Sequence, residues 1–398
     1  MTTSGWGGQT FIQSPPLSPT LDLTANSLLI KFRVDQWARI GGGVLLFASS
    51  DDSADMRTTR AEVHIAEDGS LFASDGEFVW VNVNPGDWTT PGGFSAPNLN
   101  SITRVGVGIV DHDTGPLKVN VQQVWTRPAP TATGTVLAFD DGFLSQYTNV
   151  KPYLDKYGMR AVAFPIHGNT SPGSGAGSYM GATELQALYD DGWDLSVHSD
   201  LTASHDSKNG FNDLSTTDGT ATTLSSFEGE LARAKMWLTS NGWTRGADFF
   251  AWPQGKFDAT RLAIARKYFT LIRVYRPTLS TPDADTYPFV DGGRLRQLGV
   301  FGAASPDSVD AVNAALDAAW AAKKTVVLTF HNVIPGGGSR GVDYPLANFQ
   351  SIIDHIAEVG YPVKTLSQVM VDGGMAVPEG APIDPESAGD TGPTIPHP

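Results

Sequence analysis

The feature that most constrains the fold is a change of pattern near residue 135. From there to residue 372, short apolar runs alternate with stretches of helical spacing. The runs Thr135–Phe139 and Thr325–Phe330 are almost wholly apolar, which is typical of strands buried on both faces of a parallel sheet. Helices are predicted over Thr183–Asp191, Ser226–Asn241, Val309–Ala322 and Phe349–Val359. Residues 135–372 therefore predict a parallel α/β architecture, most simply a (β/α) barrel.

Residues 21–127 follow a different period. Apolar side chains alternate with others along Leu28–Val34, Val105–Ile109 and Leu117–Gln122, as in strands with one buried face. Turn signals such as Asp75-Gly76 separate such runs. This segment predicts an all-β antiparallel sandwich. It resembles concanavalin-like or laminin-G-like jelly rolls in pattern and size alone.

Three shorter segments complete the predicted organisation into several domains. Residues 1–20 are rich in Gly, Pro, Ser and Thr, which indicates a loose arm or one that docks on a partner through Trp6, Phe11 and Ile12. Residues 128–134 form a Pro-containing linker. Residues 373–398 are rich in Pro and Gly and are expected to be disordered or extended.

Composition excludes several classes of function. The net charge is −15, from 42 acidic and 27 basic residues, which disfavours binding to nucleic acid or to an anionic membrane surface. The chain has no cysteine, so any metal site must use His, Asp and Glu. No apolar run suits membrane insertion, and Met1–Pro19 lacks the basic start and apolar stretch of a signal peptide.

Polar residues follow four of the predicted strands. They are Asp140-Asp141-Gly142, His198, Pro253-Gln254-Gly255 and His331. Each has a structural explanation by itself, because Asp-Asp-Gly can cap a turn, a lone His is often structural and Pro-x-Gly is a common loop. Ligands of parallel α/β folds bind at the carboxyl ends of the strands, so the repeated placement indicates a site. Adjacent carboxylates repel unless a cation or proton intervenes, and an imidazole beside a carboxylate is a metal-ligand pair.

The order of these motifs resembles the polysaccharide deacetylase family, the NodB-like group also called carbohydrate esterase family four, over residues 135–371. The stretch Phe227–Leu238 resembles the helix that follows the second motif of that family. The resemblance implies a distorted barrel of seven or eight strand–helix units. It also implies metal-dependent removal of acetyl groups from a polysaccharide, with N-acetylglucosamine polymers or peptidoglycan as the first class and O-acetyl xylan as the alternative.

The resemblance also implies roles for the motif residues. Asp140 would be the catalytic base and His331 the general acid, acting from opposite sides of a groove. Asp141 and His198 would bind a divalent metal, with zinc expected and cobalt or manganese left open. The loop of Trp252, Pro253 and Gly255 would line the substrate groove.

Three positions depart from the family pattern. The second His of the family falls at Thr202, so either a bulge brings His205 to the metal, which we favour, or Asp200 replaces the imidazole. Ala251 stands where an Arg is common. We place Arg273 with the groove residues, where Arg273 or Arg276 could steady Asp140, and a surface position is the alternative. Asn332 stands where Asp is common.

The irregular second motif also supports an alternative function, a non-catalytic glycan-binding protein on a degenerate deacetylase scaffold. The β-sandwich would hold the chain on glycan or on an assembly, with Trp37, Trp80, Trp88 and Trp125 as candidates for sugar stacking or as core residues. A cell-surface substrate implies an extracellular chain trimmed of its leader, or a phage tail protein in a virion. Oligomerisation is left open.

Overall fold

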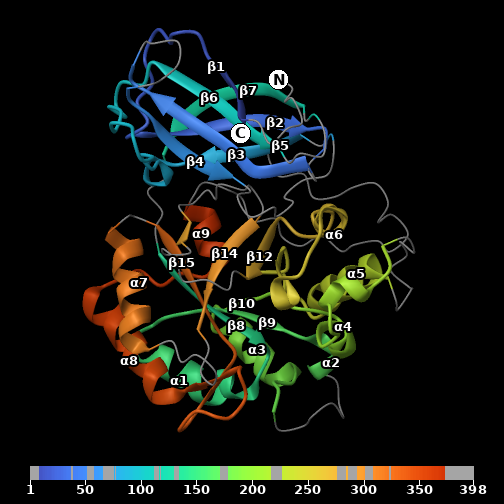
Figure 1. Cartoon of the computed structure of the whole chain (residues 1–398). Helices are drawn as coiled ribbons and strands as arrows, with labels where there is room; N and C mark the ends of the chain where they lie inside the picture. Colours follow the sequence, from blue (N-terminus) through green and yellow to red (C-terminus); the bar gives the residue numbers. More distant parts are fainter. Residues whose placement is uncertain are drawn as a thin grey trace. The chain divides into compact units, whose positions relative to one another are not determined.

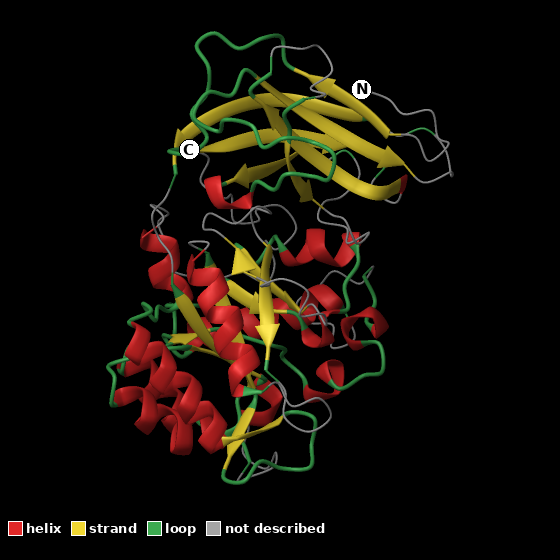
Figure 2. Ribbon diagram, turned by 60° about the vertical axis from the view of Figure 1, so that its left-hand side comes forward, coloured by secondary structure: helices red, strands yellow, loops and turns green. Residues whose placement is uncertain are grey.

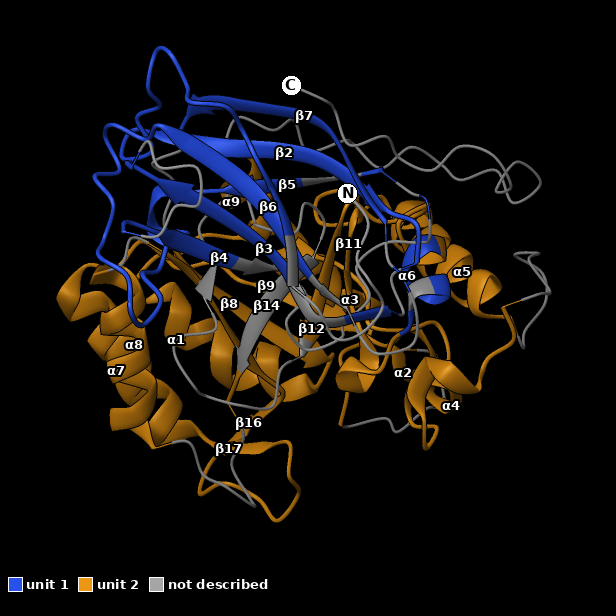
Figure 3. Cartoon of the chain, turned by 45° about the horizontal axis from the view of Figure 1, so that its top comes forward, with its two compact units in different colours: residues 1–131, 258–263, 288–292 blue, residues 132–257, 264–287, 293–398 orange. Residues whose placement is uncertain are grey.

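The computed structural model describes residues 9–36, 39–51, 58–65, 76, 78–111, 116, 118–129, 134–170, 178–216, 226–275, 284–285, 294–300, 308–321 and 324–372. The chain divides into two compact units (Figure 3). Unit 1 comprises residues 1–131, 258–263 and 288–292, and unit 2 comprises residues 132–257, 264–287 and 293–398. The predicted tail, 373–398, and most of the predicted linker lie outside the described residues.

Unit 1 contains two antiparallel sheets (Figure 1). Its strands are β1 (Gln9–Gln13), β2 (Asn26–Val34), β3 (Ile40–Ser49), β4 (Ala61–Ile65), β5 (Phe78–Val83), β6 (Arg104–Asp111) and β7 (Val119–Pro128). One sheet has the order β1-β6-β3-β4 and the other β5-β2-β7. The strands predicted from alternation over 28–34 and 105–109 are confirmed, whereas a jelly-roll connection of the strands stays a prediction.

The first strand corrects the prediction of a loose arm. Residues Gln9–Gln13 pair antiparallel with β6, with Phe11 opposite Gly108. The rings of Phe11 and Phe47 meet edge to face at 5.8 Å. Phe11 and Ile12 are nevertheless 48% and 49% exposed, and Trp6 lies outside the described residues. A strand this short could not be recognised in a Pro-rich stretch, because its partner is about a hundred residues away.

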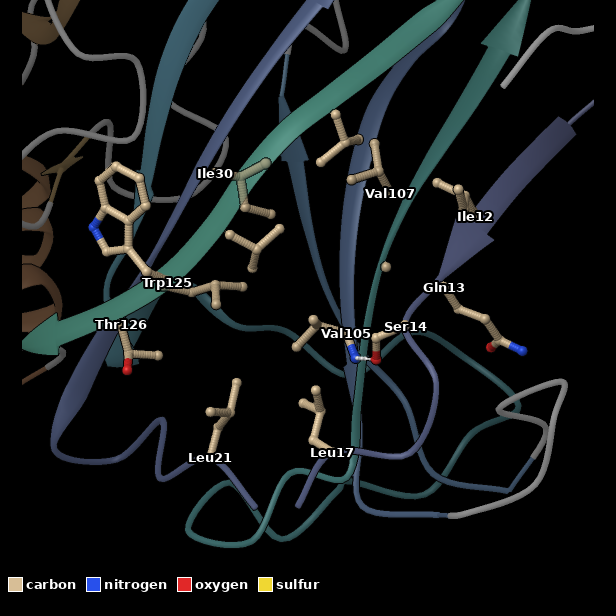
Figure 4. A pocket seen from close by; sticks show the side chains of 14 residues that line it. Ile12, Gln13, Ser14, Leu17, Leu21, Ile30, Val105, Val107, Trp125 and Thr126 are labelled. Atoms are coloured by element: carbon tan, nitrogen blue, oxygen red, sulfur yellow. Dashed lines mark hydrogen bonds between the residues drawn. The ribbon is translucent and has the colours of Figure 1, made fainter. Parts of the chain in front are cut away.

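A largely apolar pocket of about 630 Å³ lies between the two sheets of unit 1 (Figure 4). Its walls come from β1 and β6 on one side and from β2 and β7 on the other. Trp125 is among the residues that line it. Of the other tryptophans considered for sugar stacking, Trp88 is half-buried, and Trp37 and the side chain of Trp80 are not among the described parts.

Unit 2 is built on parallel strands surrounded by helices (Figure 2). Its strands are β8 (Thr135–Asp141), β9 (Val162–Pro165), β10 (Asp194–Leu195), β11 (Phe249–Ala251), β12 (Leu271–Tyr275), β13 (Ala284–Asp285), β14 (Arg294–Gly299), β15 (Thr325–Phe330), β16 (Asn332–Ile334) and β17 (Asp343–Pro345). Its sheet runs β10-β9-β8-β15-β14-β12-β11, with β13 paired to β15. A parallel bridge between Val197 and Phe250 joins the two ends of this path, so the sheet closes into a barrel. The prediction of a parallel α/β barrel is confirmed.

The helices largely follow the predicted periodicity. They are α1 (Lys151–Asp155), α2 (His167–Thr170), α3 (Ala182–Asp190), α4 (Thr202–His205), α5 (Phe227–Ser240), α6 (Ala259–Ala265), α7 (Val309–Ala321), α8 (Leu346–Val359) and α9 (Leu366–Asp372). Ser226 caps α5 by accepting a hydrogen bond from the Gly229 amide (2.9 Å). Gly360 ends α8 in a left-handed conformation. No helix in the described ranges is long and apolar enough to cross a membrane.

Candidate metal-binding and catalytic site

The register of two neighbouring strands brings Asp140 and His331 together. Strands β8 and β15 pair in parallel, with Phe139 opposite Phe330. Asp140 follows Phe139 on β8, and His331 follows Phe330 on β15. His331 Nε2 lies 3.7 Å from Asp140 Oδ2. The two side chains lie next to each other at the carboxyl ends of the strands, which corrects the expectation that they face each other across a groove.

Arg273 holds the carboxylate of Asp140 from β12. Its Nη2 donates to both carboxylate oxygens, at 2.8 and 2.7 Å, and its Nη1 donates to Thr329 Oγ1 at 2.7 Å. The guanidinium lies over the ring of Phe164 and is buried. The assignment of Arg273 to a substrate groove, and the surface alternative, are therefore wrong, because both Nη atoms are turned to barrel residues. Arg276 lies outside the described residues.

This environment keeps Asp140 ionised. Burial by itself would raise the pKa of the carboxyl group, but the charge and hydrogen bonds of Arg273 oppose this rise, and the pKa lies below its ordinary value. A carboxylate that stays deprotonated at neutral pH can accept a proton.

Asp141 has an unusual backbone conformation at the end of β8. Its φ is 66°, in the left-handed region that non-glycine residues seldom adopt. Gly142 follows with a φ of 77°, and a Cβ at this position would lie 2.8 Å from Pro165 Cβ on β9. The turn after β8 therefore requires glycine, which explains the Asp-Asp-Gly sequence.

The variant Gly142→Ala is expected to destabilise unit 2 by more than the roughly 1–2 kcal/mol that a left-handed conformation costs an alanine. The variant Gly158→Ala is the matched control, because Gly158 has a φ of 64° and nothing within 4 Å of a Cβ built there. Denaturant unfolding of both variants measures the difference. Equal losses would show that the contact with Pro165 has no cost.

His198 is oriented by two backbone contacts. Its amide donates to Pro165 O (3.0 Å), and its Nδ1 lies 2.6 Å from Ala251 O. Because a carbonyl oxygen can only accept, Nδ1 carries the proton and Nε2 offers its lone pair. Burial lowers the pKa of His198 to about 3, so the ring stays neutral, as a metal ligand must be.

His205 reaches the same place from the end of α4. Its Nε2 lies 3.3 Å from Asp141 Oδ1, and its Nδ1 lies 2.7 Å from Asp206 Oδ1. One ligand atom from each of Asp141, His198 and His205 lies within 4.8 Å of the others. Asp200, the alternative third ligand, instead contacts Arg233 and His167.

The three residues fit a divalent metal. Among the described residues, none donates a hydrogen bond to the buried Asp141 Oδ1, so this oxygen is available as a ligand. Two imidazole nitrogens and one carboxylate oxygen are a donor set suited to zinc and to several other divalent ions. The contacts of His198 with a carbonyl and of His205 with a carboxylate are those that orient metal-bound imidazoles.

The Pro-x-Gly turn is placed differently from the prediction. Trp252 is only 2% exposed and packs against Phe227, Phe250 and Phe257. The prediction that its indole lines a substrate groove is therefore wrong, because the aromatic cluster around α5 and β11 buries it. Pro253 is buried too, and Gly255 is half-buried.

Sequence reasoning missed the residues that connect the site loops. Gln254 has a φ of 56°, and its Nε2 donates to His205 O (2.9 Å) and Ser207 O (3.0 Å). Gln146 Nε2 donates to Asp140 O (2.6 Å) and His331 O (3.1 Å). These contacts hold the loops together. In the sequence, Gln254 was recognisable only as the middle residue of the Pro-x-Gly motif. The contacts of Gln146 depend on strand register, which a local sequence pattern does not show.

Asn332 belongs to a polar network behind His331. Ser145 Oγ donates to Asn332 Oδ1 (2.7 Å), and Asn332 Nδ2 donates to Asp343 Oδ1 (2.8 Å). The side-chain amide of Asn332 therefore accepts a hydrogen bond from Ser145 and donates one to Asp343. An ionised Asp at this position could not donate.

Part of the chain is similar to known proteins. Residues 129–269 match the family model described as Polysaccharide deacetylase, so this part of the chain carries a polysaccharide deacetylase domain. No curated protein sequence matches the chain.

Solved structures that are similar to part of this chain include the following three. The Xyl-CE4 domain of a multidomain xylanase from the hindgut metagenome of Trinervitermes trinervoides is 17% identical, with a TM-score of 0.38, over 62% of this chain and 94% of that one. A family 4 acetyl xylan esterase from Clostridium thermocellum is 14% identical (TM-score 0.37), over 64% and 95%. The chitin deacetylase of Colletotrichum lindemuthianum is 13% identical (TM-score 0.41), over 61% and 89%.

Proposed function

We propose that this protein is a metal-dependent hydrolase that removes acetyl groups from a cell-surface polysaccharide. The observation that carries the proposal is the metal-ligand group of Asp141, His198 and His205 beside the pair of Asp140 and His331. An N-acetylglucosamine polymer or peptidoglycan is the first substrate class, and O-acetyl xylan is the second.

The chain's own residues supply the proton transfers. A bound divalent cation, zinc by preference, would supply Lewis-acid activation of the acetyl group and of the attacking water. Asp140, kept ionised by Arg273, accepts the proton of that water at a carboxylate oxygen. His331 Nε2, 3.7 Å from Asp140 Oδ2, donates a proton to the departing amine or hydroxyl. Asp206 and the Ala251 carbonyl hold the imidazoles of His205 and His198 in orientation.

The geometry favours the hydrolase over a degenerate glycan-binding scaffold. The alternative depended on the missing imidazole at Thr202. His205, three residues later, lies 3.3 Å from Asp141 and supplies an imidazole at that place. Glycan binding by unit 1 stays a prediction, as does an extracellular or virion location. A gene beside phage tail genes would support the virion, and one in a capsule or cell-wall locus would contradict it.

Metal content tests the proposal without knowledge of the polysaccharide. After incubation with zinc and removal of free metal, elemental analysis is expected to find about one zinc per chain in the wild type, as in a mononuclear catalytic site. The variant Asp141→Ala is expected to lose it, because one of three ligands is gone. The control Asp354→Ala removes an exposed carboxylate that contacts Tyr153 and Tyr157, and is expected to keep the zinc. A wild type without zinc would contradict the hydrolase and leave the glycan-binding alternative.

A further inference from the structure

The segment between His198 and His205 is held by one buried carboxylate. Glu230, on α5, is 0% exposed. Its Oε1 accepts hydrogen bonds from the amides of Asp200 (2.9 Å) and Leu201 (2.8 Å), and its Oε2 lies 3.3 Å from Ser204 Oγ. In the sequence, all three partners lie between His198 and His205, the two imidazoles of the candidate metal site.

The contact with Leu201 continues to His205. The carbonyl of Leu201 accepts the amides of Ser204 (3.1 Å) and His205 (3.2 Å), and so begins the short helix α4. Leu201 thus donates a hydrogen bond to Glu230 through its N–H and accepts one from the His205 amide through its C=O. A shift of Leu201 would therefore move His205 relative to Asp141.

A second layer of charges surrounds this carboxylate. Arg233 Nε donates to Asp200 Oδ2 (2.6 Å), and Arg233 Nη2 lies 3.3 Å from Glu230 Oε2. His167 Nδ1 lies 2.7 Å from Asp200 Oδ1, and its ring stacks on Trp237 with centroids 4.7 Å apart. Glu230, Arg233 and Trp237 share one face of α5, because they are three and four residues apart.

A buried carboxylate is costly unless hydrogen bonds compensate for the lost water. Burial raises the pKa of Glu230 to about 7, and the Leu201 amide is the strongest of the groups that oppose this rise. An apolar side chain at this position would avoid the desolvation cost but would leave the amides of Asp200 and Leu201 without an acceptor. The carboxylate therefore serves the loop rather than the packing of α5.

We propose that Glu230 is a positioning residue of the metal site, which holds His205 beside Asp141 and His198 through Leu201. This inference rests on the proposed metal-dependent function. It explains how a second motif with a longer spacing between its imidazoles can still complete a three-ligand group.

The test is the affinity of the full-length protein for Zn²⁺, measured by competition with a chromogenic chelator. The variant Glu230→Met removes the acceptor of the Asp200 and Leu201 amides. It is expected to bind Zn²⁺ at least about tenfold more weakly than the wild type, the range found when residues that support metal ligands are replaced. Glu228→Met is the matched control. Glu228 is also a buried acid on α5, but it contacts Tyr268 Oη (3.1 Å) and Lys267 Nζ (3.3 Å), away from the loop, so its affinity is expected to stay unchanged.

A double-mutant cycle separates positioning from a general loss of structure. In a His205→Ala background, Glu230→Met is expected to have little further effect on zinc affinity, because the ligand that Glu230 positions is already gone. If Glu230→Met does not fold, Arg233→Gln, at a partly exposed position, is expected to weaken zinc binding in the same direction. Unchanged affinity in the folded Glu230→Met protein, or an equal loss with and without His205, would overturn the inference. A wild type that binds no zinc would instead overturn the proposed function.

Discussion

Replacement of Arg273 by Met is expected to lower the free energy of unfolding of unit 2 by about 3–5 kcal/mol, the cost of leaving one partner of a buried ion pair alone. The side chains of Arg273 and Asp140 are only 2% and 4% exposed, so water cannot replace the guanidinium. Denaturant unfolding measures the loss. The matched control is Arg160→Met, which removes partly exposed ion pairs with Asp155 and Asp191 and is expected to cost about 1 kcal/mol or less. Similar losses in the two variants would contradict a structural role of the buried pair.

The loss in Arg273→Met should depend on pH. Arg273 lowers the pKa of Asp140 below its ordinary value of 3.8, so the pair contributes its full stability above pH 3.8. That contribution is lost as the pH falls through the lowered pKa of the folded state. The difference between wild type and variant is therefore expected to be largest near neutral pH and to shrink in acid. In activity, the acid limb of the variant's pH profile should move to higher pH, because Asp140 must be ionised to accept a proton.

The variant Asp140→Asn is expected to lower kcat by about 10²–10⁴-fold, the contribution of a general base. An amide cannot accept the proton of the attacking water, whereas Asp141, His198 and His205 are unchanged and should retain zinc. The assay is acetate release from N-acetylglucosamine oligomers and from acetylated xylan, with zinc content measured on the same samples. A zinc-loaded Asp140→Asn protein with full activity would contradict the role of Asp140 as the base.

A second buried acid of the barrel provides the control for Asp140→Asn. Asp194, on β10, is also fully buried and accepts a hydrogen bond from the Ser367 amide (2.7 Å). Within the described residues, its side chain contacts Ser367 and Arg245 and none of the site residues. Asp194→Asn is therefore expected to keep both zinc and activity. A parallel loss in both variants would show that Asp140→Asn acts through folding rather than through proton transfer.

The sequence by itself determined the barrel of unit 2 and the residues at its strand ends. Apolar runs such as Thr135–Phe139 and Thr325–Phe330 are strands because both of their faces are buried, and a polar residue directly after such a run lies at the carboxyl end. Asp140, Asp141 and His331 were identifiable for this reason, since local pattern and topology are enough to place them.

Only the tertiary structure decided the contacts between distant segments. The order of the strands places Arg273 against Asp140, and the path of one loop places His205 rather than Asp200 beside Asp141. Burial of Trp252 depends on the packing of several elements around its indole, and the position of Leu201 depends on Glu230. Such contacts follow from register, loop path and side-chain packing, which involve residues far apart in the chain, whereas periodicity reports only which face of a local segment is apolar.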